Sequence, residues 1–270
     1  MADARTDTHV ETKQDGHSLW VTLNQPEKRN ALSSTMLNAI STALNQGYED
    51  PQTRVIVLSA KGPVFSAGHD LAEMSPQNGE SKQARDQRVK DILQLCASMM
   101  MGIVNAPKPV IACVQGTATA AGCQLVSACD LAIADSNAQF CTPGVNIGIF
   151  CTTPLVGIGR NVSRKHAMEM ALTGDMFSAD QAQTFGLINR HVDTAALVAE
   201  TKALADKIAS RSAQGIRAGK AAFYHQIDLP LADAFAYANE EMRCAVTSEG
   251  DAIEGTAAFL EKRPPKWGDA

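Results

Sequence analysis

The chain of 270 residues is predicted to have an α/β fold that ends in an all-helical region, on the basis of three features. Two continuous apolar runs of strand length, 55–60 and 109–114, are each followed by a turn and then by small or polar residues. Apolar runs of this length that are rich in β-branched residues are typical of buried strands. From residue 194 onward the apolar residues recur at helical spacing, which predicts helices and no further strand.

The N-terminal half divides into short elements bounded by turn residues. We expect a flexible N-terminus over 1–15, a strand over 17–23, and a turn-rich loop over 24–32. A helix capped by Ser33 or Ser34 is predicted to run to Tyr48, because Met36 and Ile40 belong to an apolar face at helical spacing. A polar segment after residue 75 is expected to be mobile at its start and helical over 82–105.

The second half is expected to alternate strands and helices before it becomes helical. A strand beginning near Cys129, a short strand after residue 138, and helices over 163–172 and 178–185 are predicted. Helices are then predicted over 194–210, 212–226, 230–248 and 251–262. These elements suggest a core over 16–193 and a helical C-terminal region over 194–270.

Composition excludes several classes of protein. A net charge of −5 and a pI near 5.7 argue against general nucleic-acid binding, which needs a basic face. The polar, acidic N-terminus does not fit a signal peptide, and the uncharged stretch 110–129 carries too many polar residues and glycines for a membrane span. Seven cysteines without a CxxC pair indicate buried thiols in a reducing compartment and no metal site. We therefore expect a soluble, cytoplasmic protein with no membrane partner.

Two loops are candidates for a binding site made of backbone amides. The segment 115–122 joins a strand to a helix through small residues, and the loop 61–71 follows the other apolar strand. A strand, a tight turn and a helix start direct free N–H groups toward one point, and donors from two loops can form an oxyanion hole. The plainer interpretation of either segment alone is a close-packed junction between a strand and a helix.

The two segments, taken together, resemble the crotonase superfamily, which is the enoyl-CoA hydratase/isomerase family. FSAGHDL (65–71) resembles its Phe-x-Ala-Gly-x-Asp-Leu element, and VQGTATAAGCQLVSACDLAIAD (114–135) resembles its strand–Gly–helix element. The resemblance extends from about residue 20 to residue 266. It implies a spiral of right-handed ββα units, an acyl-CoA or enoyl-CoA substrate in fatty-acid metabolism, and a homotrimer or hexamer built with the C-terminal helices. No cofactor is implied, since coenzyme A enters as part of the substrate.

The resemblance also assigns candidate residues. Backbone N–H groups of Ala67 and Ala121 would form the oxyanion hole. The remaining residues expected to contact the acyl-CoA are Gly68, His69 and Asp70 beside the hole, Lys28 and Arg29 near the pantetheine and phosphates, and Phe259 and Lys262 over the adenine and 3′-phosphate, often from a neighbouring subunit.

Both glutamates that hydratases of this family use are replaced, by Gln124 and Gly144. Hydration needs one group that takes a proton from water and one that protonates the α-carbon, and neither residue can take a proton at neutral pH. Within the superfamily, one group labelled hydratase-like by descent is similar to this chain in the same segments. Three functions remain open: a lyase of the enoyl-CoA hydratase type with weak catalysis, another oxyanion-hole reaction such as thioester hydrolysis or decarboxylation, or a non-catalytic acyl-CoA-binding or regulatory protein.

Overall fold

Two sheets of mainly parallel strands form the centre of the computed structural model, which describes residues 9–268. The larger sheet has the order β1-β2-β3-β5-β7-β10, in which only β1 runs antiparallel to its neighbour. Its strands are β1 (Val10–Asp15), β2 (Ser18–Leu23), β3 (Val55–Ala60), β5 (Val110–Val114), β7 (Leu131–Asp135) and β10 (Arg190–Val192). The smaller sheet, of order β4-β6-β8-β9, contains β4 (Val64–Ser66), β6 (Thr117–Thr119), β8 (Gln139–Cys141) and β9 (Phe177–Ser178).

The strand β1 corrects the expectation of a flexible N-terminus over 1–15. Residues 10–15 pair in register with β2, from Val10 opposite Leu23 to Asp15 opposite Ser18. Only Val10 of this strand is buried, and the residues after it are mostly polar. The sequence therefore lacks the apolar pattern by which a strand is recognised. Residues 1–8 lie outside the described part of the chain.

The chain winds as a spiral in which each turn contributes one strand to each sheet and then a helix. The first turn is β3, β4 and the helices α2 (Leu71–Met74) and α3 (Lys82–Val104). The second is β5, β6 and α4 (Ala121–Ala128), and the third is β7, β8, the 3₁₀ helix η2 (Pro143–Ile147) and α5 (Pro154–Asn161). This topology confirms the predicted ββα spiral, and α6 (Arg164–Thr173), α7 (Ala179–Phe185) and β10 complete it.

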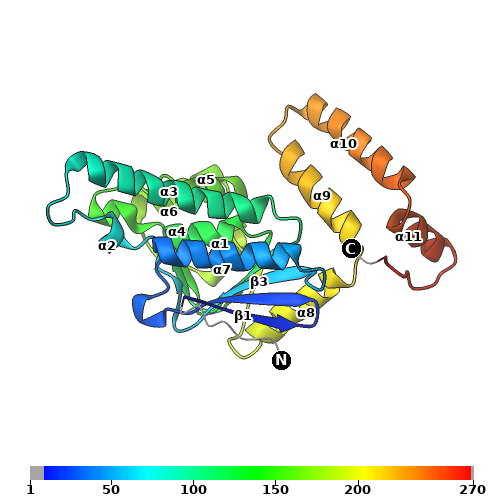
Figure 1. The fold of residues 1–270 in the computed structure, drawn as a ribbon, viewed down its shortest axis with the longest axis horizontal. Helices are drawn as coiled ribbons and strands as arrows, with labels where there is room; N and C mark the ends of the chain where they lie inside the picture. Colours follow the sequence, from blue (N-terminus) through cyan, green and yellow to red (C-terminus); the bar gives the residue numbers. More distant parts are fainter. Residues whose placement is uncertain (1–8, 269–270) are drawn as a thin grey trace.

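Helices cover both faces of the larger sheet (Figure 1). Alternate residues of β3 point in opposite directions, so Ile56 packs with α1 (Ser34–Glu49) and α3, whereas Val57 packs with α8 (Leu197–Ala209). Ser33 caps α1 through the Met36 N–H, as predicted. Since α8 buries Leu197 and Ala205 against the sheet, the packed core extends past the boundary expected at residue 193.

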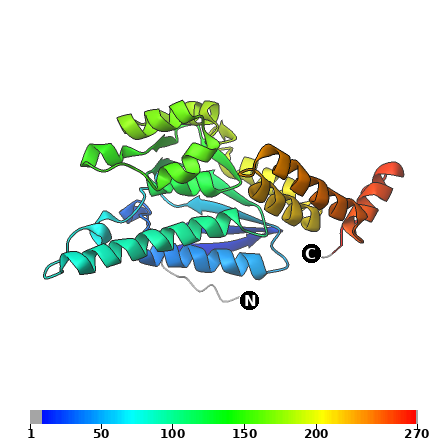
Figure 2. The same cartoon turned by 90° about the horizontal axis from the view of Figure 1, so that it is seen from above.

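The last three helices form an extension that we call the C-terminal arm: α9 (Ala213–Gln226), α10 (Leu231–Thr247) and α11 (Asp251–Leu260). Figures 1 and 2 show the arm projecting away from the core. The predicted C-terminal helices are confirmed within a few residues. In a single chain the arm leaves large apolar side chains exposed, namely Phe223, Ile227, Leu231, Phe235, Met242, Val246, Ile253, Phe259 and Leu260.

A partly buried ion pair joins the arm to the core. Lys220 Nζ of α9 lies 2.7 Å from Asp130 Oδ2, and the two side chains are only 8% and 16% exposed. The ammonium also donates to the carbonyls of Ile103 and Lys108, and the Tyr224 hydroxyl donates to Asp130 Oδ1 at 3.0 Å. Every proton of the ammonium therefore has an acceptor on the core. Within residues 9–268, no helix is both long and apolar enough to cross a membrane.

Replacing Lys220 by Met is expected to lower the free energy of unfolding by about 3–5 kcal/mol, because the Asp130 carboxylate would lose its buried counter-ion. Urea denaturation measures the change. The matched control is Lys202→Met, which removes partly exposed ion pairs with Asp15 and Asp206 and should change stability by at most about 1 kcal/mol. Equal stability of the two variants would show that the Lys220 pair does not hold the arm.

Candidate functional site

The loop after β4 and the start of α4 meet at the carboxyl ends of the smaller sheet. Thr119 Oγ1 donates to the Ala67 carbonyl at 2.9 Å, which ties the two segments together. Gly68 has φ +83° and lies so close to α4 that a Cβ atom on it would stand 2.9 Å from the Ala121 amide nitrogen. Only glycine fits there, both for its positive φ and for this approach.

Asn30 fastens this loop from behind. It is fully buried at φ 49°, and its side-chain amide donates to the carbonyls of Lys61 and Val64. Its side-chain oxygen accepts the Gln25 N–H, and its own carbonyl accepts the Ser66 hydroxyl. The side chain thus uses both donors and its acceptor to hold the 24–32 loop against β4.

The free backbone amide of the first loop belongs to His69 and not to Ala67, where it was expected. The Ala67 N–H donates to the Arg29 carbonyl at 3.0 Å, so it is not free, and the prediction for Ala67 does not hold. His69 pairs with Leu32 in an isolated parallel bridge, which uses the Gly68 carbonyl and the Asp70 N–H. The His69 N–H itself has no hydrogen-bond partner among the described residues.

Ala121 supplies the second free amide. It is the first residue of α4, where an N–H has no acceptor within the helix, and its side chain is fully buried. The residue before it, Ala120, adopts φ 49° and ψ −118°, a conformation that is rare outside glycine. Ala120 donates its N–H to the Cys141 carbonyl, so the neighbouring strand fixes the strained residue.

The two positions of the missing glutamates are buried. Gln124, in α4, is 8% exposed, and its side-chain oxygen has no hydrogen-bond partner in the described part of the chain. At Gly144 the space for a side chain is taken: a Cβ atom there would stand 2.9 Å from Cys151 Sγ and 2.8 Å from the Ile149 carbonyl oxygen. The Gly144 N–H donates to the same sulfur at 3.2 Å. The glutamate position is therefore filled by Cys151.

Burial shifts the pKa of two side chains beside the site, Cys151 and His69, toward their neutral forms. Burial raises the pKa of the Cys151 thiol, although the hydrogen bond from Gly144 opposes this, so the thiol is not poised as a thiolate. Burial lowers the pKa of His69, whose Nε2 atom has no partner among residues 9–268, so its imidazole is neutral. Asp70 caps α2, because its carboxylate accepts the Ala72 N–H at 2.9 Å.

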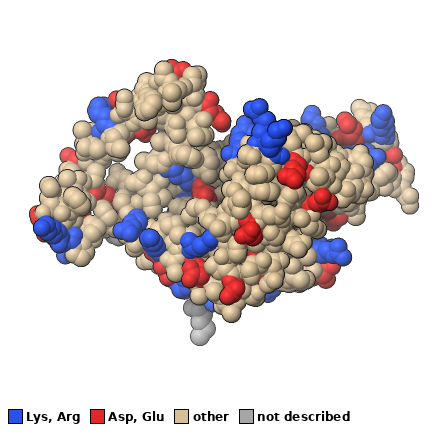
Figure 3. All heavy atoms as spheres, turned by 180° about the vertical axis from the view of Figure 1, so that it is seen from behind, with Lys and Arg blue, Asp and Glu red and all other residues tan. Residues whose placement is uncertain are grey.

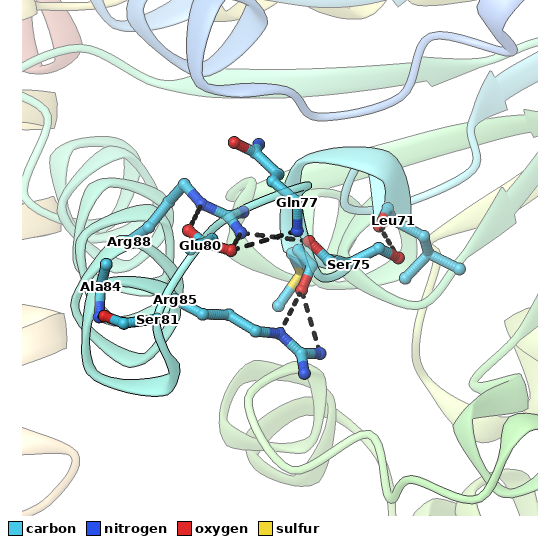
Figure 4. Close-up of polar contacts among 9 residues, drawn as sticks. Leu71, Ser75, Gln77, Glu80, Ser81, Ala84, Arg85 and Arg88 are labelled. Atoms are coloured by element: carbon cyan, nitrogen blue, oxygen red, sulfur yellow. Dashed lines mark hydrogen bonds and ion pairs between the residues drawn. The ribbon is translucent and has the colours of Figure 1, made fainter.

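Arginine side chains of α3 tie down the segment expected to be mobile after residue 75 (Figure 4). Arg85 donates to the Met74 carbonyl, and Arg88 donates to the Ser75 carbonyl. Arg88 also pairs with Glu80 at 2.6 Å, and its hydrogen bond holds the pKa of that carboxyl below its usual value. The helix α3 begins at Lys82, as predicted.

The remaining predicted contact residues lie in two places. Lys28 and Arg29 are exposed on the loop whose Arg29 carbonyl accepts the Ala67 N–H, so they border the site. Phe259 is 82% exposed in α11, and Lys262 follows it at φ 55°. Figure 1 places α11 at the far end of the arm from α2, so one chain does not bring these two residues to the site.

Two features of the site were not predicted from the sequence. The free amide of His69 follows from a bridge to Leu32 that no local pattern marks. The contact between Cys151 and Gly144 had one signal, Gly148, whose φ of +78° lets the chain reverse between them. No group of three or more His, Cys, Asp or Glu side chains in residues 9–268 is arranged to hold a metal ion.

Known proteins resemble this chain in both sequence and fold. Residues 16–270 match the enoyl-CoA hydratase/isomerase family. Enoyl-CoA hydratase domain-containing protein 3, mitochondrial, from Mus musculus is 43% identical over 95% of this chain and 83% of its own length. The crystal structure of human enoyl-CoA hydratase domain-containing protein 3 is 41% identical with a TM-score of 0.90, over 96% of this chain and all of that one. An enoyl-CoA hydratase from Mycobacterium smegmatis is 42% identical with a TM-score of 0.89, over 96% and 98% of the two chains.

The expectation of a cytoplasmic protein is wrong on this comparison. The relatives from Mus musculus, Rattus norvegicus and Homo sapiens are named as mitochondrial proteins, which points to a mitochondrial location. The expectation rested partly on the free cysteines, six of which are buried. Free thiols indicate a reducing compartment and do not separate one such compartment from another.

Replacing Ala120 by Gly is expected to raise the free energy of unfolding by about 1 kcal/mol, because glycine adopts φ 49° without steric strain. The matched control is Ala121→Gly, one residue inside the helix, which should lower stability by about 0.5–1 kcal/mol. Chemical denaturation of both variants measures the difference. A loss of stability in Ala120→Gly would contradict the strained conformation.

Replacing Gly144 by Ala is expected to lower stability by about 1–3 kcal/mol, because the new methyl group would overlap the Cys151 sulfur and the Ile149 carbonyl. Gly159→Ala in α5 serves as the control, since a Cβ atom there meets nothing within 4 Å. That variant should be neutral or slightly more stable in a thermal unfolding experiment. If both variants unfold alike, the space over Gly144 is not filled.

Proposed function

The chain belongs to the enoyl-CoA hydratase/isomerase family, and we propose on that premise that it binds acyl-CoA thioesters through backbone amides. In this proposal the N–H groups of His69 and Ala121 donate to the thioester carbonyl oxygen. The observation that carries it is the juxtaposition at Gly68, which sets two loops together, each with an amide that has no partner among the described residues.

The physical gain from such a pair is greatest when the carbonyl becomes an enolate. Fixed donors in a buried site stabilise the developing negative charge without reorganising, by about 3 kcal/mol for each donor. The Ala121 amide adds the positive end of the α4 dipole, and every residue of α4 is buried. The two amides therefore favour an enolate or a polarised thioester over the free substrate.

Efficient hydration is not part of this proposal. Adding water across a double bond needs a base for the water and an acid for the α-carbon. Gln124 offers an amide, and Cys151 occupies the space above Gly144 with a protonated thiol. We infer a protein that binds acyl-CoA in the manner of its family and hydrates enoyl-CoA weakly.

Decarboxylation or cleavage of an acyl-CoA is the second candidate. Loss of carbon dioxide from a carboxylated acyl group leaves the enolate directly, so the reaction needs the two amide donors and one proton but no carboxylate base. The observation that favours it is a pair of free amides beside two glutamate positions that carry no carboxylate. The alternative without chemistry is a non-catalytic acyl-CoA-binding or regulatory protein.

The coenzyme A end of the ligand is proposed to be shared between copies of the chain. Lys28 and Arg29 are exposed beside the site and suit phosphate groups. Phe259 and Lys262 would reach the adenine of a neighbouring chain, because the arm projects from the core and exposes apolar side chains. A homotrimer or a hexamer fits this arrangement, and fatty-acid metabolism fits the ligand.

The test of carbonyl binding is the absorbance of hexadienoyl-CoA, whose conjugated thioester should shift to longer wavelength when its carbonyl accepts two hydrogen bonds. Ala121→Pro removes one donor at the first position of α4, so the shift should shrink or vanish. Ala213→Pro removes an amide at the same position of α9 and should keep the shift. Circular dichroism checks that both variants fold. A full shift in folded Ala121→Pro would remove Ala121 from the proposal.

A further inference from the structure

A cavity of about 500 Å³ lies between the core and the C-terminal arm. The core lines it with Arg54, just before β3, and with Lys108, just before β5. The arm lines it with the first turn of α9, including Arg217, and with the start of α11 at Asp251. It therefore closes only where the arm packs onto the core.

This cavity is remote from the proposed acyl-CoA site. The strands β3 and β5 run parallel, and the cavity is at their amino ends. From the carboxyl ends of the same strands the chain continues through β4 and β6 of the smaller sheet, and only then reaches His69 and Ala121. A strand of five or six residues spans about 16–20 Å, so the length of β3 and β5 separates the cavity from the two amides.

Three cationic side chains converge on the cavity. Lys108 is held in place, since its ammonium donates to the carbonyls of Gly47 at 2.9 Å and Asp50 at 2.6 Å. One nitrogen of Arg54 donates to the Arg211 carbonyl, and the Arg217 side chain has no hydrogen-bond partner within residues 9–268. Burial lowers the pKa of Lys108, Asp50 opposes this, and the charges of Arg217 and Arg54 lower it further. All three side chains line the same cavity.

Two helix N-termini add to the positive potential. The first turns of α9, at Ala213 and Gln214, and of α11, at Asp251, face the cavity. Two acids also line it, Glu49 and Asp251, and the Asp251 carboxylate is engaged by the Gly268 N–H at 2.8 Å. Together with Asp50, which acts on Lys108, these acids offset the three cations, so the groups that the cavity offers to an anion are the two helix ends and the unpaired donors of Arg54 and Arg217. Figure 3 shows Lys and Arg side chains, with Asp and Glu side chains among them, where the arm meets the core.

We propose that this cavity binds the phosphate group of a small molecule. A phosphate oxygen set can accept from Arg54 and Arg217 at once, and its charge would relieve the repulsion among the three cations. The cavity is larger than a phosphate ion, and Tyr48, Pro107 and Ile216 give it apolar walls for an organic part. A bound phosphate would bridge the core to the arm.

Isothermal titration of the full chain with inorganic phosphate tests the proposal, at constant ionic strength set with sodium chloride. Saturable binding with one site per chain is expected. Arg217→Gln should weaken it by at least about tenfold, because a charged hydrogen-bond donor is lost. The matched control is Lys207→Gln on the exposed side of α8, which removes the same charge outside the cavity and should bind like the parent chain.

A parallel titration with glycerol 3-phosphate distinguishes an organic phosphate from the free ion. Tighter binding of the ester indicates that the ligand contacts the apolar walls, and equal binding indicates that the site binds the ion alone.

Arg217→Gln should keep the spectral shift of bound hexadienoyl-CoA. The proposal is overturned if no saturable binding occurs, if the two variants lose affinity equally, or if phosphate displaces hexadienoyl-CoA, since the ion would then occupy the acyl-CoA site.

Discussion

The close approach of Gly68 to the Ala121 amide determines how the rest of the site is built. A Cβ atom on Gly68 would stand 2.9 Å from that nitrogen, so the two loops are held at a distance that admits no side chain. The Asn30 side chain fixes the first loop through hydrogen bonds to the carbonyls of Lys61 and Val64. In the second loop, Ala120 adopts a strained backbone conformation immediately before the Ala121 amide. Local strain of this kind persists only where surrounding contacts fix it, and here both loops are fixed by strands of the smaller sheet.

The backbone geometry of the site is present, but the two carboxylates that the family uses for acid–base chemistry are not. The amides and the glycine that spaces them are present, whereas Gln124 replaces one carboxylate and Cys151 fills the space of the other. The loss at Gly144 is therefore more than a missing side chain, because the loop from 144 to 151 packs a sulfur and a carbonyl where a larger residue would begin. A chain built this way can still polarise a thioester, while its chemistry must come from another source or be absent.

The sequence predicts the spiral well because its signals are local or shared with a family. The apolar strands β3 and β5, the Ser33 cap and the C-terminal helices follow from composition and spacing, and the family resemblance supplies the winding. What it missed depends on contacts between distant segments. The polar strand β1 forms only because β2 offers an edge, and α8 joins the core through the far face of β3. The exchange of Ala67 for His69 depends on the Arg29 carbonyl, which comes from a third loop.

The most direct test of the account is the rate at which the purified chain consumes crotonyl-CoA, followed as loss of the conjugated thioester absorbance under conditions where binding is saturated. The account predicts bound ligand and a turnover at least about 10²-fold below the roughly 10 s⁻¹ typical of enzymes, since the acid–base pair is missing. Turnover at an ordinary enzymatic rate would contradict it and would mean that the site hydrates without carboxylates at residues 124 and 144.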